Sequence, residues 1–234
     1  MNTMRWVSQV GIASYDYLFG REECPTSTSN LYLKFLQKLS SNQRVLDVGV
    51  GMGVYFKDPR CQTEIQRKNL EIVGIDVDEV AIEVARQRIE SAGLSQSVAA
   101  RCVRLEDITC HGFDVVVFSE SYPVIPQEDI IPMLRHVRAT FNGHTVAFIN
   151  NLEENPTWIQ KCKKIFPRWI AYLGRVVNRT DMQEALQKAG FEEKPAFELL
   201  AEADANEVLF KNRVQFPFLR FKMKQYLVSL KIGA

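Results

Sequence analysis

Residues 45–53 read Val-Leu-Asp-Val-Gly-Val-Gly-Met-Gly, a short apolar run that leads directly into three glycines at alternate positions. Buried parallel strands are apolar in this way, and glycine lets the backbone turn sharply and approach a ligand because it has no Cβ. In a doubly wound sheet, the loop after the first strand lies in the ligand crevice. The stretch therefore predicts an α/β sheet with a ligand at the end of its first strand.

The order of the remaining elements agrees with that prediction. Short β-branched runs alternate with helical patterns from residue 44 to residue 214, as expected for a parallel sheet with helices on both faces. The expected strands are 45–47, 72–75, 102–105, 115–118, 146–149, 196–200 and 207–211. The expected helices include those through residues 31–39, 80–91, 127–141, 155–166 and 180–189. We expect an α/β fold, a doubly wound Rossmann-like seven-stranded sheet in a single domain.

Composition excludes several other classes of protein. Hydrophobic residues make up 46% and charged residues 24%, with a net charge of +1, which gives no bias towards nucleic acid or membrane. The five cysteines form no CxxC pair, so we expect neither a disulfide framework nor a metal site. No stretch resembles a signal peptide or a transmembrane segment. These features predict a cytoplasmic protein.

Two acidic residues lie near the glycines at informative positions. Asp47 precedes Gly49 by two residues, and Asp76 ends the second expected strand. A carboxylate at that strand end can accept hydrogen bonds from both hydroxyls of a ribose. The spacing of Gly49, Gly51 and Gly53 lacks the third glycine of the nicotinamide pattern GxGxxG. The ligand is therefore expected to carry a ribose, and the glycine spacing does not match the nicotinamide pattern.

This arrangement resembles the DxGxGxG motif of class I S-adenosylmethionine-dependent methyltransferases, over about residues 44–214. The resemblance implies S-adenosylmethionine as cofactor, with Gly49, Gly51 and Gly53 around its methionine part. It also implies that Asp47 supports the loop or the cofactor's amino group, that Asp76 binds the ribose, and that Val77, Glu106 and Asp107 lie near the adenine. One departure is the interruption Lys57-Asp58-Pro59, which predicts a broken or shifted first helix.

The segment after the fourth expected strand holds the candidate catalytic residues. Methyl transfer is an in-line displacement, and it needs a base only when the acceptor atom is protonated. Glu120 and Tyr122 are expected over the methyl group, where Glu120 accepts a proton, pairs with a cationic substrate, or only bonds neighbouring amides. Ser119, assigned to the cofactor site, and Tyr122 match the ends of the [DNS]PP[YF] motif of amino-methyltransferases. Glu120 and Ser121 replace its prolines, which argues against adenine or glutamine amide acceptors.

Three segments outside the core complete the expected organisation. In small-molecule members of the family an N-terminal segment often folds over the substrate, and residues 1–43 would be that lid, with Tyr15 and Tyr17 facing the acceptor. Asn150 and, in the insertion 151–179, Trp169 are further substrate candidates. Residues 215–234 predict a basic amphipathic helix because cations, without any acid, accompany apolar residues at helical spacing. It would cover its own protein, bind an acidic partner or contact anionic lipid.

We therefore expect an enzyme that moves a methyl group from S-adenosylmethionine to O, N or S of a small organic acceptor. The first alternative is a methyltransferase for protein or RNA that docks through its basic stretches. The near-zero net charge gives no strong nucleic-acid signal. The second alternative is a non-catalytic nucleotide- or NAD-binding Rossmann protein. The three histidines lie before strands or within a helix, so we expect them to be structural.

Overall fold

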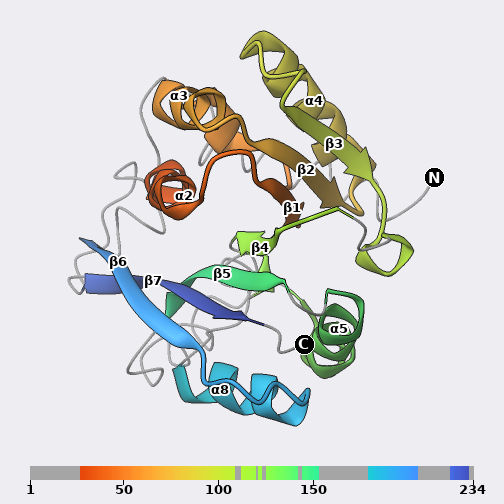
Figure 1. The fold of residues 1–234 in the computed structure, drawn as a ribbon, viewed down its shortest axis with the longest axis vertical. Coiled ribbons are helices and arrows are strands. Elements are labelled where there is room, and N and C mark those ends of the chain that lie inside the picture. Colours follow the sequence, from red (N-terminus) through yellow and green to blue (C-terminus); the bar gives the residue numbers. More distant parts are fainter. Residues whose placement is uncertain are drawn as a thin grey trace, which may run out of the picture.

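The computed structural model describes residues 27–108, 112–119, 121–122, 125–141, 144–152, 179–204 and 222–231. Within these residues, one seven-stranded sheet has the order β3-β2-β1-β4-β5-β7-β6 (Figure 1). The strands are β1 Arg44–Val48, β2 Glu71–Asp76, β3 Val98–Cys102, β4 Val115–Ser119, β5 Thr145–Leu152, β6 Ala196–Asp204 and β7 Lys222–Lys231. The first five pair in parallel, whereas β7 is antiparallel to both β5 and β6.

Helices cover both faces of this sheet. They are α2 Ser27–Lys38, α3 Pro59–Arg67, α4 Glu79–Ser91, α5 Gln127–Thr140 and α8 Arg179–Lys188, with 3-10 turns η2 Val54–Lys57 and η3 Leu105–Asp107. Alternate residues of a strand face opposite sides. Thus Val115 and Val117 pack with α2, α3 and α4, while Val116 and Phe118 pack with α5 and α8 (Figure 1). This two-sided core confirms the doubly wound fold.

Most of the predicted elements are confirmed, and one strand is displaced. Helix α4 begins after Asp78, whose carboxylate accepts hydrogen bonds from Val80 and Ala81, and Gly93 follows it with φ of 67°. Strand β3 occupies residues 98–102 rather than 102–105. At this sheet edge only Val98 and Ala100 are buried, so the strand has a weak apolar signal. The expected strand 207–211 and the expected helix 155–166 lie outside the described residues.

The prediction of a basic amphipathic helix over 215–234 is wrong for the part that the structure describes. Residues 222–231 form β7, which pairs along its length with β5 and β6. The core therefore extends beyond residue 214, and residues 222–231 do not form the helix that we expected to cover the protein itself, bind an acidic partner or contact lipid. Apolar residues such as Leu227 and Leu230 have a spacing that fits a helix. The segment is nevertheless a strand, because it forms hydrogen bonds with two neighbouring strands.

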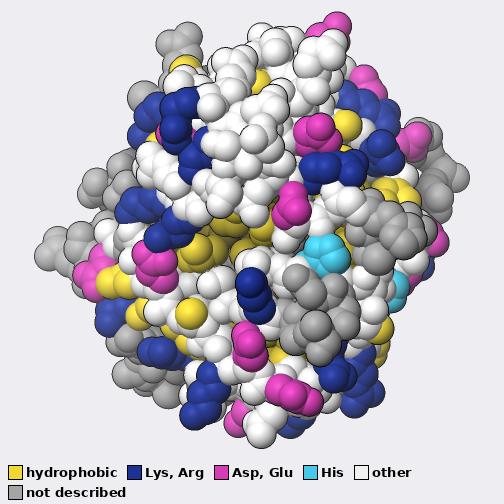
Figure 2. Space-filling model, viewed as in Figure 1, with side chains coloured by type: hydrophobic (Ala, Val, Ile, Leu, Met, Phe, Trp, Pro, Cys, Tyr) yellow, Lys and Arg dark blue, Asp and Glu magenta, His cyan; other side chains and the backbone are white. Residues whose placement is uncertain are grey.

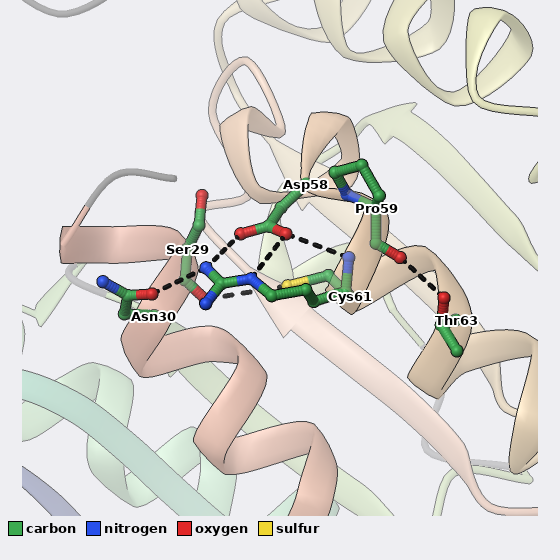
Figure 3. Close-up of polar contacts among 7 residues, drawn as sticks. Ser29, Asn30, Asp58, Pro59, Cys61 and Thr63 are labelled. Atoms are coloured by element: carbon green, nitrogen blue, oxygen red, sulfur yellow. Dashed lines mark hydrogen bonds and ion pairs between the residues drawn. The ribbon is translucent and has the colours of Figure 1, made fainter. Parts of the chain in front are cut away.

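The expected break in the helix after the glycine loop is confirmed. The chain forms η2, and α3 then begins at Pro59, where the missing N–H of proline leaves no hydrogen bond unmade. Asp58 caps α3 by accepting a hydrogen bond from Arg60 N at 3.0 Å. The Arg60 guanidinium bridges Asp58 (2.7 Å) and Asn30 Oδ1 (2.6 Å), which joins α3 to α2 (Figure 3).

A buried lysine attaches the other end of α2. Lys68 is only 6% exposed, and its Nζ donates to the carbonyl oxygens of Leu36, Gln37 and Leu39 at 2.9, 2.7 and 2.6 Å. The last carbonyls of a helix have no partner within the helix, and a cation is favourable at that end. Lys68 therefore anchors the C-terminus of α2 to the end of α3.

Replacing Lys68 with methionine should lower the free energy of unfolding by about 2–3 kcal/mol, because buried carbonyls lose a charged donor. The control is Lys188→Met, which removes an exposed pair with Glu184 at 3.2 Å and should cost less than about 0.5 kcal/mol. Urea denaturation measures both variants. Equal losses would show that the three buried hydrogen bonds of Lys68 contribute nothing beyond a surface ion pair.

The surface agrees with the balanced composition. On the face shown in Figure 2, acidic and basic side chains are interspersed, and hydrophobic side chains are visible in a hollow near the centre. Among the described helices, none has the length and hydropathy to cross a bilayer.

Candidate cofactor and acceptor site

Three glycines in left-handed conformation shape the loop after β1. Gly49, Gly51 and Gly53 have φ of 77°, 53° and 58°. A Cβ on Gly49 would lie 2.4 Å from Ser121 Cβ, and one on Gly53 would lie 2.7 Å from the Phe56 ring. A Cβ on Gly51 would have no atom within 4 Å. Packing therefore requires the first and third glycines, whereas the space beside the second remains open.

Hydrogen bonds hold the loop in this shape. Gly49 N and Val50 N donate to Ile75 O at 2.8 and 3.0 Å, which ties the loop to β2. From α4, the Arg88 guanidinium donates to Met52 O at 2.9 Å. The loop is thus preorganised by contacts to the second strand and to the helix that follows it.

Asp76 lies at the carboxyl end of β2, beside the loop. Its Oδ2 accepts from Gly51 N at 2.9 Å, and its Oδ1 accepts from Asp78 N at 3.0 Å. These two bonds fix the carboxylate at the position expected to receive a ribose. The next side chain, Val77, is 71% exposed, which leaves an apolar surface beside the strand end. Glu106 and Asp107 are exposed on η3, after β3. The roles of these residues towards ribose and adenine stay predictions.

Asp76→Ala should weaken binding of S-adenosylhomocysteine at least about tenfold, because the variant loses both the expected ribose acceptor and the hydrogen bond to Gly51 N. Calorimetry measures the dissociation constant. Asp114→Ala is the matched control, since Asp114 accepts from Arg44 N at 2.7 Å at the amino end of β4, opposite the crevice. Unchanged affinity in Asp76→Ala would remove this residue from the cofactor site.

Asp47 lies buried beneath the loop, with no exposed surface. Its Oδ2 accepts a hydrogen bond from the Tyr55 hydroxyl, and its Oδ1 has no partner among the described residues. Burial raises the pKa of Asp47 to about 7, although the Tyr55 hydrogen bond opposes the rise. Of the two roles expected for this carboxylate, the bond to Tyr55 supports that of holding the loop.

The segment after β4 comes close to the glycine loop. Ser121 Oγ donates to Val48 O at 2.7 Å, and Ser121 fills the space next to Gly49. Ser119 is 8% exposed, and its Oγ has no partner among the described residues. Tyr122 is 2% exposed and packs edge-on against Phe148 at 5.5 Å, within the core cluster that includes α5. Packing is thus the observed role of Tyr122, and its catalytic role stays a prediction.

Several predicted site residues lie outside the described part of the chain, namely Glu120, Tyr15, Tyr17 and Trp169. Asn150 is in β5, paired with Tyr226 of β7, and nothing further is described of its side chain. Two of the histidines have structural contacts, as expected. His136 Nε2 lies 3.3 Å from Thr140 Oγ1, and the His144 ring lies edge-on to Phe141.

Sequence reasoning missed three residues that shape the loop, Tyr32, Tyr55 and Arg88. In the sequence, the two tyrosines are indistinguishable from ordinary aromatic residues of a core. Arg88 is indistinguishable from an ordinary polar residue on the exposed face of α4. The only available signal was the place of Tyr55, two residues after Gly53. Their contacts with the loop arise from tertiary packing, which residue spacing does not reveal.

The strand order, the antiparallel β7 and the left-handed glycine loop define a class I Rossmann-like methyltransferase fold. Residues 45–142 match the family model described as a methyltransferase domain. Over residues 45–142 the chain is thus similar to methyltransferase domains, which use S-adenosylmethionine as cofactor. Among curated protein sequences, none matches this chain significantly.

Solved structures share the fold at low identity. A putative methyltransferase from Bacillus halodurans C-125 is 18% identical with a TM-score of 0.63, and the match covers 88% of this chain and 99% of that one. The methyltransferase SibL is 17% identical with a TM-score of 0.59, over 96% of this chain and 57% of SibL. Haemonchus contortus phosphoethanolamine N-methyltransferase 2 is 17% identical with a TM-score of 0.64, over 97% of this chain and 58% of that one. This chain thus spans under two thirds of the last two proteins.

Proposed function

We propose that this protein transfers the methyl group of S-adenosylmethionine to O, N or S of a small organic acceptor. The observation that carries the proposal is the close approach of the segment after β4 to the glycine loop. A Cβ on Gly49 would lie 2.4 Å from that of Ser121, so Ser121 adjoins the place where the methionine part of the cofactor would bind. An acceptor held by this segment would meet the methyl group directly.

The chemistry of the same segment supports a compact acceptor. Ser119 places a buried hydroxyl without a partner among the described residues at the end of β4. Buried polar atoms are normally paired, so an unpaired one is available to a ligand. Glu120 follows directly in the sequence and is proposed to accept a proton or pair with a cationic acceptor. Haemonchus contortus phosphoethanolamine N-methyltransferase 2, crystallised with phosphomonomethylethanolamine, has such a small acceptor on the same fold.

Charge gives little support to the macromolecular alternative. The net charge is +1, and Figure 2 shows mixed charges on the viewed face rather than a continuous basic surface. Tight binding to nucleic acid needs a concentrated basic surface, because it depends on releasing counterions from phosphates. We also propose a cytoplasmic location, which fits the free thiols of Cys61 and Cys102.

A methyl-transfer screen tests the proposal. The purified protein is incubated with S-adenosylmethionine labelled in its methyl group and with a cell extract divided into small-molecule, RNA and protein fractions. We expect label in the small-molecule fraction, and mass spectrometry then identifies the acceptor. Label confined to RNA or to protein would contradict the proposal in favour of a macromolecular acceptor.

A further inference from the structure

A buried cluster beneath the glycine loop joins the loop to helix α2. The Tyr55 hydroxyl donates to Asp47 Oδ2, and the Tyr32 ring stacks on the Tyr55 ring with 3.7 Å between centroids and 13° between planes. Tyr32 and Asp47 have no exposed surface, and Tyr55 is 3% exposed. Since Tyr32 belongs to α2, this stacked pair is a direct connection from the N-terminal helix to the base of the loop.

The Asp47–Tyr55 hydrogen bond closes the loop from below. Asp47 lies two residues before Gly49, and Tyr55 lies two residues after Gly53, so the bond joins the two ends of the glycine segment. Next to Tyr55, the Phe56 ring occupies the space beside Gly53. Both ends of the loop are therefore held by side chains, in addition to the backbone bonds to β2.

The cluster buries polar atoms at positions where apolar side chains would be more stable. Asp47 Oδ1 and the Tyr32 hydroxyl are buried, and in the described part of the chain neither makes a hydrogen bond of good geometry, although Tyr32 is near enough to lower the pKa of Asp47. Apolar side chains would fill this space without that cost, because unpaired buried polar groups destabilise a fold. Such departures from good packing gather at functional sites. The position of these atoms, directly under the cofactor loop, indicates a functional role.

Helix α2 has attachments that do not involve this cluster. Lys68 binds its C-terminal carbonyls, Asn30 pairs with Arg60 of α3, and Lys38 forms an ion pair with Glu198 of β6 at 2.6 Å. Removing a tyrosine hydroxyl therefore leaves these attachments intact. The effect of the cluster on the loop can be measured separately from the docking of the helix.

We propose that Tyr32 and Tyr55 are positioning residues for the cofactor: Tyr55 closes the glycine loop through Asp47, and Tyr32 holds Tyr55 in place from α2. Docking of α2 thus completes the cofactor site. The proposal rests on the S-adenosylmethionine cofactor and is independent of which acceptor is methylated.

The first test compares hydroxyl-free variants by calorimetry with S-adenosylhomocysteine between pH 6 and pH 8.5. Tyr55→Phe should weaken binding about tenfold, because it removes a hydrogen bond to a charged group. Tyr32→Phe keeps the stacked ring and should weaken binding only about threefold. The control is Tyr226→Phe on β7, which β4 and β5 separate from β1. The control should bind like the wild type.

The pH dependence distinguishes positioning from a general loss of structure. Burial raises the pKa of Asp47 to about 7 and the Tyr55 hydrogen bond opposes that rise, so Tyr55→Phe should move the midpoint of binding to higher pH. The other groups that act on Asp47 are Tyr32 from α2, which lowers its pKa, and Asp76 from β2, which raises it. Both remain in this variant. A merely destabilised protein would keep the wild-type midpoint.

Hydrogen exchange provides a readout that needs no ligand. In Tyr55→Phe the amides of Gly49, Val50 and Gly53 should exchange about tenfold faster, while those of α5 keep their wild-type rates. Wild-type exchange in the loop together with wild-type affinity and midpoint would overturn the proposal. If the wild type bound no S-adenosylhomocysteine, the cofactor assignment would fail on its own, and the exchange rates would still decide whether Tyr55 closes the loop.

Discussion

Asp47→Asn should increase the free energy of unfolding by about 4 kcal/mol above pH 7 and remove much of its decline between pH 4 and pH 7. Burial raises the pKa of this carboxyl from 3.8 to about 7, because an ionised group is disfavoured away from water. An asparagine has nearly the same shape and can accept the Tyr55 hydrogen bond without carrying a charge.

The direction of this pH dependence follows from the pH range over which the folded and the unfolded chain each keep the proton of Asp47. Below pH 4 both the folded and the unfolded chain bind it, so the carboxyl imposes no penalty. Between pH 4 and pH 7 the unfolded chain releases the proton while folded Asp47 retains it, so stability falls as pH rises. Above pH 7 both states are ionised and the penalty is constant. The difference between variant and wild type should therefore grow from near zero at pH 4 to its maximum above pH 7.

Urea denaturation of both proteins across this pH range measures the difference, because the other titrating groups are common to both. Asp114→Asn serves as control, since it makes the same chemical change at an exposed carboxylate. The variant should also bind S-adenosylhomocysteine about tenfold more weakly, as expected when a buried charge serves a cationic ligand at the expense of stability. If the free energy of unfolding of Asp47→Asn differed from that of the wild type by the same amount at every pH, ionisation of Asp47 would not destabilise the folded protein.

Gly51→Ala should abolish cofactor binding while leaving the fold nearly intact. A Cβ at this position has no atom within 4 Å, so no protein atom opposes it, and the left-handed φ of 53° costs only about 1 kcal/mol. The same Cβ would project into the space that the cofactor is expected to occupy. We expect a loss of affinity of at least about a hundredfold, since overlap with a ligand cannot be relieved by a preorganised loop.

Two other glycines provide the comparison. Gly93→Ala introduces a Cβ into open space at φ of 67°, after α4, and should show the same small loss of stability with unchanged cofactor affinity. Gly49→Ala places a Cβ 2.4 Å from Ser121 Cβ and should lower stability by about 3 kcal/mol. Calorimetry and thermal unfolding of the three variants separate these effects. Normal cofactor affinity in Gly51→Ala would show that the cofactor does not approach the loop there.

Local patterns were sufficient for much of the architecture. The strands 45–47, 72–75 and 115–118 were predictable because strands buried on both faces consist mostly of apolar residues. Helix α4 was predictable because its capping residue Asp78 lies directly before it. Two strands were harder to predict: the edge strand β3 buries alternate small residues, and β7 has an apolar spacing that fits a helix as well as a strand.

The sequence by itself determined the class of fold, the position of the cofactor loop and the acid at the end of β2, since each depends on residues close together in the chain. Tertiary structure alone decided that β7 lies between β5 and β6, that Tyr122 lies in the core, and that Tyr32 of α2 stacks on Tyr55 beneath the loop. These last contacts join segments far apart in the sequence. Their energy comes from packing and from pairing between elements, which no local periodicity records.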